Sequence, residues 1–221
     1  MDFKRKLSVS NIISQRVNRI PFTGDFYQAF GNPQDRGVWF VYGNSASGKS
    51  TFLMMLAKEF ARLKYGVLYN LLEEDPDDSD YIDRVKRLNM FDVKERFHTI
   101  QIRNIKRLTA FLKKRRNAKV IIIDSLVYQK ISFDEYLEFK RQFRNKILIF
   151  VGHGKGAAPR TKIEEDVMYD AKMKIYVSGY EAVCKGRTIG PNGGSFIIWK
   201  EGYEQLHGIT LNNNNHDTIS N

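Results

Sequence analysis

The chain has 221 residues, of which 42% are hydrophobic and 28% are charged, and it carries a formal net charge of +11. This length suits one α/β domain with a substantial core, and no apolar stretch reaches the roughly 20 residues that cross a bilayer. The excess of lysine and arginine favours a polyanionic partner such as nucleic acid, although a basic surface that only aids solubility would give the same count.

The first part of the chain is predicted to form a short helical arm over residues 1–20, and residues 1–35 are predicted to precede the main domain. No apolar run follows the first basic residues, so we expect no secretory signal. Cys184 is the one cysteine, which excludes an intrachain disulfide, and its strand-like surroundings predict a small buried side chain. Together these features predict a cytoplasmic protein.

A glycine-rich loop follows the apolar run at 38–42 and leads into a helical pattern over 49–64. It has the form G-x-x-x-x-G-K-[ST], and a strand before it and a helix after it are the context that a phosphate-binding loop requires. The predicted nucleotide-binding residues are Gly43, Asn44, Ser45, Ala46, Ser47, Gly48, Lys49, Ser50 and Thr51.

The residues that define such a loop each have a chemical role. Gly43 and Gly48 let the backbone N–H groups turn toward a phosphate, and the following helix adds the positive end of its dipole. Lys49 would reach the β- and γ-phosphates of ATP, and the Ser50 hydroxyl would bind Mg²⁺.

Acidic side chains end two of the next strand-like runs. The run that begins at Gly66 ends in Glu73 and Glu74, and Glu73 is the better placed to orient or activate a water at the γ-phosphate. The buried-looking run at 119–123 ends in Asp124, which is predicted to act with Mg²⁺ at the phosphate site.

A histidine ends the apolar run at 147–151. His153 follows Gly152 at the expected carboxyl edge of a central strand, where ligands of such sheets bind, so it is a candidate contact of the γ-phosphate or the attacking water. The glycine-rich, basic segment 154–162 is predicted to be a mobile loop, which would follow a nucleic-acid backbone or simply lie on the surface.

The alternation of runs predicts an α/β fold with a mostly parallel central sheet flanked by helices. Strand-like runs lie at 38–42, 67–72, 97–102, 119–123, 147–151, 174–178 and 195–199, and helix-like stretches lie at 49–64, 79–89, 104–116, 133–143 and 163–170. After about residue 171 the helical pattern stops, and glycine turns between strand-like segments predict antiparallel strands. The main domain is predicted over 36–207, and an asparagine-rich disordered tail over 208–221.

The phosphate loop, Glu73, Asp124 and Gly152-His153, in this order, resemble the RecA-like ATPase core, in particular its RadA/DnaB/KaiC branch. Lys185-Gly186-Arg187 resembles the Lys-x-Arg element of that branch, and the run 193–199 resembles the strand that follows it. The resemblance covers roughly residues 36–206. Without an accompanying domain, it is similar to the core-only members found in phages and mobile elements.

The resemblance implies an ATPase that works as a ring or filament of identical subunits. It implies that Glu73 activates water, Asp124 serves Mg²⁺ and His153 senses the γ-phosphate. Lys185 and Arg187 would act on the ATP of a neighbouring subunit. It also implies a role on DNA, single-stranded above all, in recombination, strand annealing or replication.

Two other classes of protein remain open at this point. An ATP-dependent loader or regulatory module would use the same loop but act on a protein partner. A small-molecule kinase would need a lid with arginines over a substrate cleft, for which the segment 154–162 with Arg160 is the one candidate.

Overall fold

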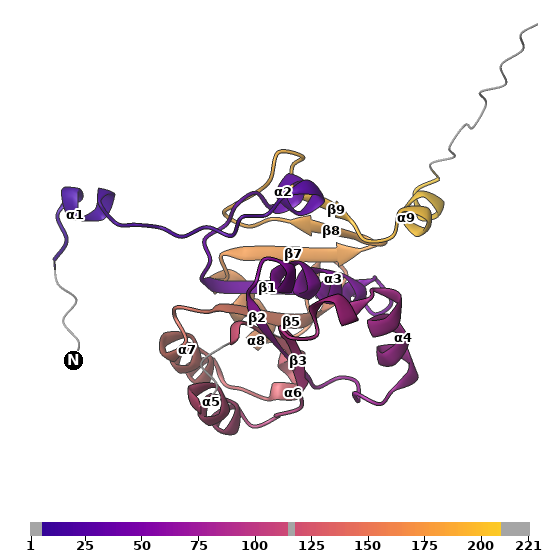
Figure 1. Ribbon diagram of the computed structural model, residues 1–221, viewed down its shortest axis with the longest axis horizontal. Helices are drawn as coiled ribbons and strands as arrows, with labels where there is room; N and C mark the ends of the chain where they lie inside the picture. The colour runs from indigo at the N-terminus through magenta and orange to yellow at the C-terminus, as the bar shows by residue number, and fades with distance from the viewer. Residues whose placement is uncertain (1–5, 115–117, 209–221) are drawn as a thin grey trace, which may run out of the picture.

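The computed structural model describes residues 6–114 and 118–208. Their strands form one sheet in the order β3-β2-β4-β5-β1-β7-β8-β9, with the short β6 paired to β5 outside this path. Figure 1 shows the sheet between two layers of helices. The predicted α/β class, with a mostly parallel sheet and antiparallel strands at the C-terminal end, is confirmed.

The strands agree closely with the apolar runs. They are β1 (Gly37–Gly43), β2 (Gly66–Leu71), β3 (Phe97–Ile100), β4 (Ala118–Asp124), β5 (Ile147–Lys155), β6 (Ala158–Pro159), β7 (Met173–Ser178), β8 (Glu181–Cys184) and β9 (Ser195–Ile197). From β3 to β7 along the sheet, every neighbouring pair of strands is parallel. The last three strands, β7, β8 and β9, form an antiparallel meander. Cys184 ends β8 as a buried free thiol, as predicted.

The helices include four short elements that the sequence patterns did not indicate. The helical elements are α1 (Val9–Ile13), α2 (Gly24–Phe30), α3 (Lys49–Arg62), α4 (Ser79–Arg87), the 3-10 turn η1 (Met90–Val93), α5 (Ile105–Lys114), α6 (Leu126–Gln129), α7 (Phe133–Gln142), α8 (Lys162–Asp170) and α9 (Lys200–Leu206). The prediction that helices end at about residue 171 is therefore wrong, because α9 follows the last strand. The unexpected elements, α2, η1, α6 and α9, have seven residues or fewer, which is too short for a clear helical period.

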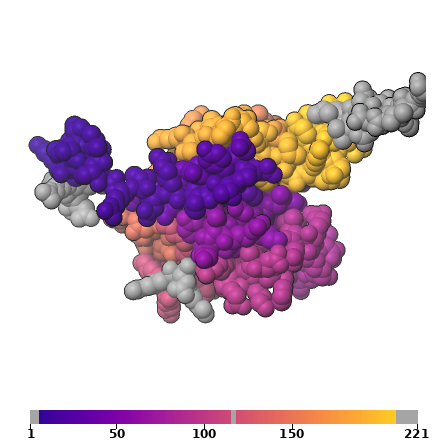
Figure 2. All heavy atoms as spheres, turned by 45° about the horizontal axis from the view of Figure 1, so that its top comes forward, coloured from indigo at the N-terminus to yellow at the C-terminus, as the bar shows by residue number. Residues whose placement is uncertain are grey.

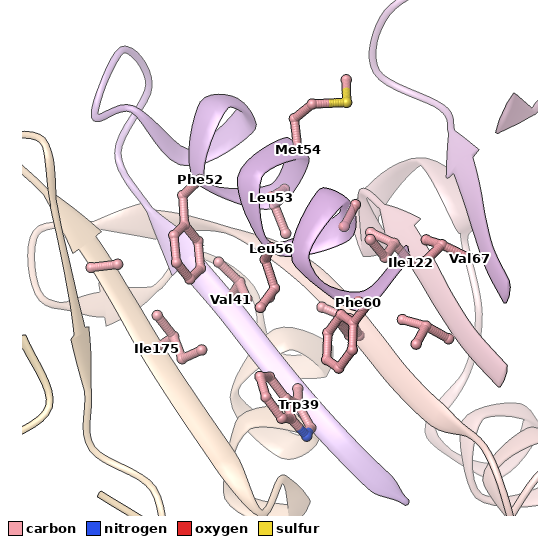
Figure 3. Packing of buried hydrophobic residues seen from close by; sticks show 14 of the residues in the cluster. Trp39, Val41, Phe52, Leu53, Met54, Leu56, Phe60, Val67, Ile122 and Ile175 are labelled. Carbon is pink, nitrogen blue, oxygen red and sulfur yellow. The ribbon is translucent and has the colours of Figure 1, made fainter. Parts of the chain in front are cut away.

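One face of the sheet packs against α2, α3 and α4. Figure 3 shows Phe52, Leu56 and Phe60 of α3 directed toward the strands, where they meet Trp39 and Val41 of β1. These five side chains are at most 1% exposed. The apolar stripe of α3 therefore fixes the helix, and with it the glycine-rich loop that precedes it, against the centre of the sheet.

The other face of the sheet packs against α5, α6, α7 and α8. Phe40, Ile121, Leu148 and Phe150 point to this side, together with Tyr136 of α7. Because side chains alternate along a strand, the central residues of β4 and β5 face both cores in turn, so all of them must be apolar. This explains the uninterrupted apolar runs of both strands.

The segment before β1 is divided between core and surface. Ile20, Phe22 and Phe30 are buried in the main core, so the chain from residue 20 onward packs against the domain. In contrast, α1 has no buried residue, and Figures 1 and 2 show it projecting away from the rest of the molecule. Residues 1–5 of the predicted arm lie outside the described residues, as do residues 209–221 of the predicted tail.

No helix in the described ranges combines the length and apolar character that crossing a membrane requires.

Candidate nucleotide site

The strand order brings the predicted site residues to one edge of the sheet. Gly43, at the end of β1, is paired with His153 of β5 on one side and with Val177 of β7 on the other. Two strands away, Leu71 of β2 is paired with Asp124 of β4, and the backbone N–H of Glu73 donates to the Asp124 carbonyl at 3.2 Å. The loop, both predicted acids and the histidine therefore share the carboxyl edge of the sheet.

The two glycines of the loop lie where a side chain would not fit. A Cβ on Gly43 would meet the Val177 carbonyl oxygen at 2.1 Å, and Gly48 has a positive φ of 93° and lies against Tyr180. Between them, Asn44, Ser45 and Ala46 are exposed. The sheet thus holds the two ends of the loop close, while its middle stays open to solvent.

Two polar groups of the loop have chemistry that suits an anion. Lys49 is only 8% exposed, and its Nζ lies 3.5 Å from the Gly43 carbonyl oxygen, which is a long contact. The Ser47 hydroxyl is buried and has no hydrogen-bond partner among the described residues. Helix α3 begins directly at Lys49, so its unpaired N–H groups and positive dipole end face the same place. These groups fit a phosphate.

Asp124 is a buried acid with an unusual titration. Its carboxylate is 4% exposed and accepts a hydrogen bond from the Tyr69 hydroxyl at 2.6 Å. Burial raises the pKa of Asp124 to about 6; the Tyr69 hydrogen bond opposes this rise and the charge of Glu73 adds to it. A cation at this carboxylate would remove much of the cost of its charge.

Glu73 and His153 form a direct contact across the edge. The His153 Nε2 lies 3.2 Å from the Glu73 Oε1, and the Glu73 side chain is 36% exposed. The hydrogen bond from His153 lowers the pKa of Glu73 despite partial burial. In turn, hydrogen bonds with Glu164 and Glu73 raise the pKa of His153 to about 9, although burial and the positive charge of Lys49 oppose this rise, so the pair is ionic at neutral pH.

Glu74 lies outside this group. Its carboxylate accepts two hydrogen bonds from the Arg84 guanidinium, at 2.9 and 3.1 Å. Such a bidentate pair holds the side chain toward α4, which leaves Glu73 as the carboxylate of this strand end that contacts His153.

The segment after His153 forms a hairpin. β5 continues to Lys155 and pairs with β6, and the Arg160 N–H donates to the His153 carbonyl at 2.9 Å. A Cβ on Gly154 would meet the backbone of Gly43 and Asn44 at 2.9 and 3.0 Å. The predicted mobile loop over 154–162 is therefore a hairpin seated against the phosphate-loop backbone.

Lys185 and Arg187 lie near the opposite edge. The Lys185 N–H donates to the Lys174 carbonyl, and the Arg187 N–H donates to the carbonyl of Lys172, which precedes β7. Both side chains are exposed. Among the described residues, no hydrogen bond or ion pair joins either side chain to the phosphate loop.

A cavity of about 400 Å³ adjoins the loop beyond Gly48 and Thr51. Tyr180 and Trp199 form one wall as an edge-to-face pair with ring centroids 4.9 Å apart, and Trp199 is 48% exposed. Arg87 of α4 closes another side and donates to the Thr51 hydroxyl at 3.3 Å. The sequence patterns did not identify Arg87, Tyr180 or Trp199, because none of them belongs to the loop motif.

The fold is similar to those of two solved archaeal proteins. The flagellar accessory protein FlaH from Methanocaldococcus jannaschii aligns over 82% of this chain and 92% of its own, with a TM-score of 0.59 and 18% identity. A KaiC-like protein from Pyrococcus horikoshii aligns over 82% of this chain and 98% of its own, with a TM-score of 0.60 and 16% identity. No protein-family model and no curated protein matches the chain. At these identities the likeness establishes the RecA-like fold.

Proposed function

We propose that this chain is an ATPase of the RecA-like type that binds ATP with Mg²⁺ at the carboxyl edge of its sheet. The observation that carries the proposal is the meeting of Gly43, Glu73, Asp124 and His153 at that edge, beside a buried lysine. Each group there matches a need of phosphoryl transfer, namely anion binding, metal binding and control of a water.

The phosphates would lie in the loop between Gly43 and Ser50. Lys49 supplies a positive charge that is nearly withdrawn from water, where its attraction for a phosphate is strong. The Ser50 hydroxyl and the Asp124 carboxylate are oxygen donors of the kind that Mg²⁺ prefers. When bound, the metal would neutralise charge on the transferred phosphoryl group.

Glu73 is the residue that we assign to the attacking water. A glutamate carboxylate is charged at neutral pH, so it can accept a hydrogen bond from water and orient it. The contact with His153 holds Glu73 when no phosphate is present. A γ-phosphate would compete for the His153 Nε2 and so release Glu73 for the water.

The base of the nucleotide would occupy the cavity beyond Gly48. The cavity adjoins the loop where the ribose of a bound nucleotide would leave it, and Trp199 offers an aromatic surface for stacking.

We further propose that Lys185 and Arg187 act on the ATP of a second copy, in a ring or filament. Their distance from their own loop along the strands supports this arrangement, because residues near the opposite edge can meet a phosphate only on another molecule. The proposed substrate of the assembly is DNA, single-stranded above all, and the net charge of +11 supports an anionic partner.

A second candidate function is an ATP-dependent module that acts on a protein partner. The observation in its favour is the exposed apolar surface of the projecting arm, whose large side chains are half or more exposed. These side chains are Leu7, Val9, Ile12, Ile13 and Val17.

The test is ATP turnover by the full chain with Mg²⁺, measured with and without single-stranded DNA. Turnover that DNA stimulates supports the ATPase acting on DNA, whereas turnover that DNA leaves unchanged favours the protein-directed module. Phosphate transfer to a small acceptor would instead identify a kinase.

Lys49→Ala should abolish turnover, because it removes the buried cation of the loop; preserved turnover in this variant would exclude the site assigned here.

A further inference from the structure

Glu164, in the first turn of α8, is a completely buried acid that sequence reasoning did not single out. Among the described residues, the only other buried residues with a charged side chain are Lys49 and Asp124, and both belong to the candidate site. A buried charge is costly unless it is paired and hydrogen-bonded. The partners of Glu164 therefore indicate its purpose.

One oxygen of Glu164 has an ordinary structural task. Oε2 accepts hydrogen bonds from the Thr161 backbone N–H at 2.9 Å and from the Thr161 hydroxyl at 2.8 Å. This is the capping box of α8, which satisfies the free N–H groups at the start of a helix. Capping accounts for Oε2 and leaves Oε1 unexplained.

The other oxygen faces the nucleotide site. Oε1 accepts a hydrogen bond from the His153 backbone N–H at 2.8 Å and lies 3.7 Å from the His153 Nδ1, the distance of an ion pair. A Cβ on Gly152 would come within 3.2 Å of this oxygen and 2.5 Å of the Phe40 ring. The glycine before His153 thus leaves the room that the carboxylate occupies.

The imidazole of His153 therefore lies between two carboxylates, with Nδ1 toward Glu164 and Nε2 toward Glu73. The two differ in exposure, since the Glu164 side chain is 0% exposed and that of Glu73 is 36% exposed. Burial raises the pKa of Glu164, but the hydrogen bonds from His153 and Thr161 outweigh it and lower the pKa overall. Glu164 is thus an anion behind the ring at neutral pH.

We propose that Glu164 is a positioning residue that keeps His153 protonated and its Nε2 directed at the phosphate edge after Glu73 has left. This inference rests on the proposed function, in which a γ-phosphate displaces Glu73 from His153. If Glu73 alone held the proton, its departure would return the imidazole to its ordinary titration and discharge it near neutral pH. Glu164 prevents this because it is not displaced.

The test is an NMR titration of the His153 imidazole in the nucleotide-free chain, with His153→Gln to assign its signals among the four histidines. Glu164→Gln removes the charge at Oε1, and we expect it to lower the pKa of His153 from about 9 by about one unit or more. Thr161→Ala is the matched control: it weakens the helix cap at Oε2 but keeps the carboxylate at His153, so the pKa should stay near 9.

An unchanged pKa in Glu164→Gln, or an equal fall in Thr161→Ala, would overturn the proposal. Should Glu164→Gln not fold, Glu73→Gln decides: a His153 that stays protonated at pH 7 supports the role of Glu164, and a neutral one contradicts it. These titrations need no turnover, so they stand apart from the ATPase test. Where turnover is present, its alkaline limb should move to lower pH in Glu164→Gln and not in Thr161→Ala.

Discussion

The burial of Asp124 lowers the stability of the fold at the pH at which its carboxylate would bind a cation. Its pKa is higher in the folded chain than the ordinary value of 3.8, so the fold binds the proton more tightly than the unfolded chain does. The contribution of this residue to stability is therefore greatest below pH 4, and it is lost as pH rises to about 6. At neutral pH the carboxylate destabilises the fold unless a cation binds.

We predict that Asp124→Asn stabilises the chain at pH 7 and abolishes Mg²⁺-dependent turnover. A shift of this size corresponds to roughly 3 kcal/mol, and the asparagine amide oxygen can still accept the Tyr69 hydrogen bond. Urea unfolding of both proteins at pH 4 and pH 7 measures the effect. The two should differ little at pH 4, where Asp124 is protonated; a difference that does not grow with pH would contradict the burial argument.

We predict that Trp199→Ala weakens ATP binding about tenfold, the loss expected for one base-stacking contact. Binding of inorganic triphosphate should not change, because it has no base, and Trp199→Phe should keep most of the affinity. Calorimetric titration of both ligands checks this. An equal loss for ATP and triphosphate would mean that Trp199 supports the loop and not the base.

Residues of the site could be predicted from the sequence where a local pattern marks them. The phosphate loop has a fixed spacing, and Glu73, Asp124 and His153 each end an apolar run. Glu164 could not be found in this way, because its partner is 11 residues away and is reached only through a hairpin. The roles of Glu73, Asp124, His153, Lys185 and Arg187 stay predictions.

Among the elements, long periodic ones were predictable and short ones were not. The apolar residues of α3 repeat with a clear helical period over its 14 residues. In contrast, α9 has only seven residues and contains Gly202, which lowers helix propensity. Gly202 is needed there because a Cβ would meet the Trp199 ring at 2.2 Å. Local packing against the Trp199 ring therefore overrides helix propensity in α9.

The helix α2 is predicted to be essential to the domain although it lies before the first strand. Phe30 is fully buried, with the rings of Phe26, Phe52 and Phe196 around it at 5.9 to 6.2 Å. Phe30→Ala should cost about 3–5 kcal/mol of unfolding free energy, measured by urea denaturation. Tyr27→Ala, on the exposed side of the same helix, should cost no more than about 0.5 kcal/mol; equal losses would show that helix formation, not burial, matters.

At the scale of the whole molecule, the placement of Arg187 predicts that activity needs two copies. Arg187→Ala should bind ATP nearly as the parent chain does but turn it over more slowly, since a charge supplied across an interface contributes about 10³–10⁵ in related phosphoryl-transfer systems. Glu73→Gln should also turn ATP over slowly, because it removes the carboxylate that is assigned to the attacking water.

Mixing Arg187→Ala with Glu73→Gln should restore part of the turnover, because some interfaces then pair an intact Glu73 with an intact Arg187. The ATPase rate of the mixture, compared with each variant alone at equal total concentration, measures this. A mixture no faster than its components would exclude action between subunits.

The position of β1 in the sheet has a consequence for synthesis of the chain. β1 carries the phosphate loop, yet its hydrogen-bonding partners, β5 and β7, are made much later, from residue 147 and residue 173 onward. A nascent chain that ends before β5 exposes both edges of an apolar strand, a state that favours pairing with other chains. The ribosome must therefore deliver most of the domain before the loop acquires its shape, and messages truncated upstream of β7 should yield aggregates that bind no nucleotide.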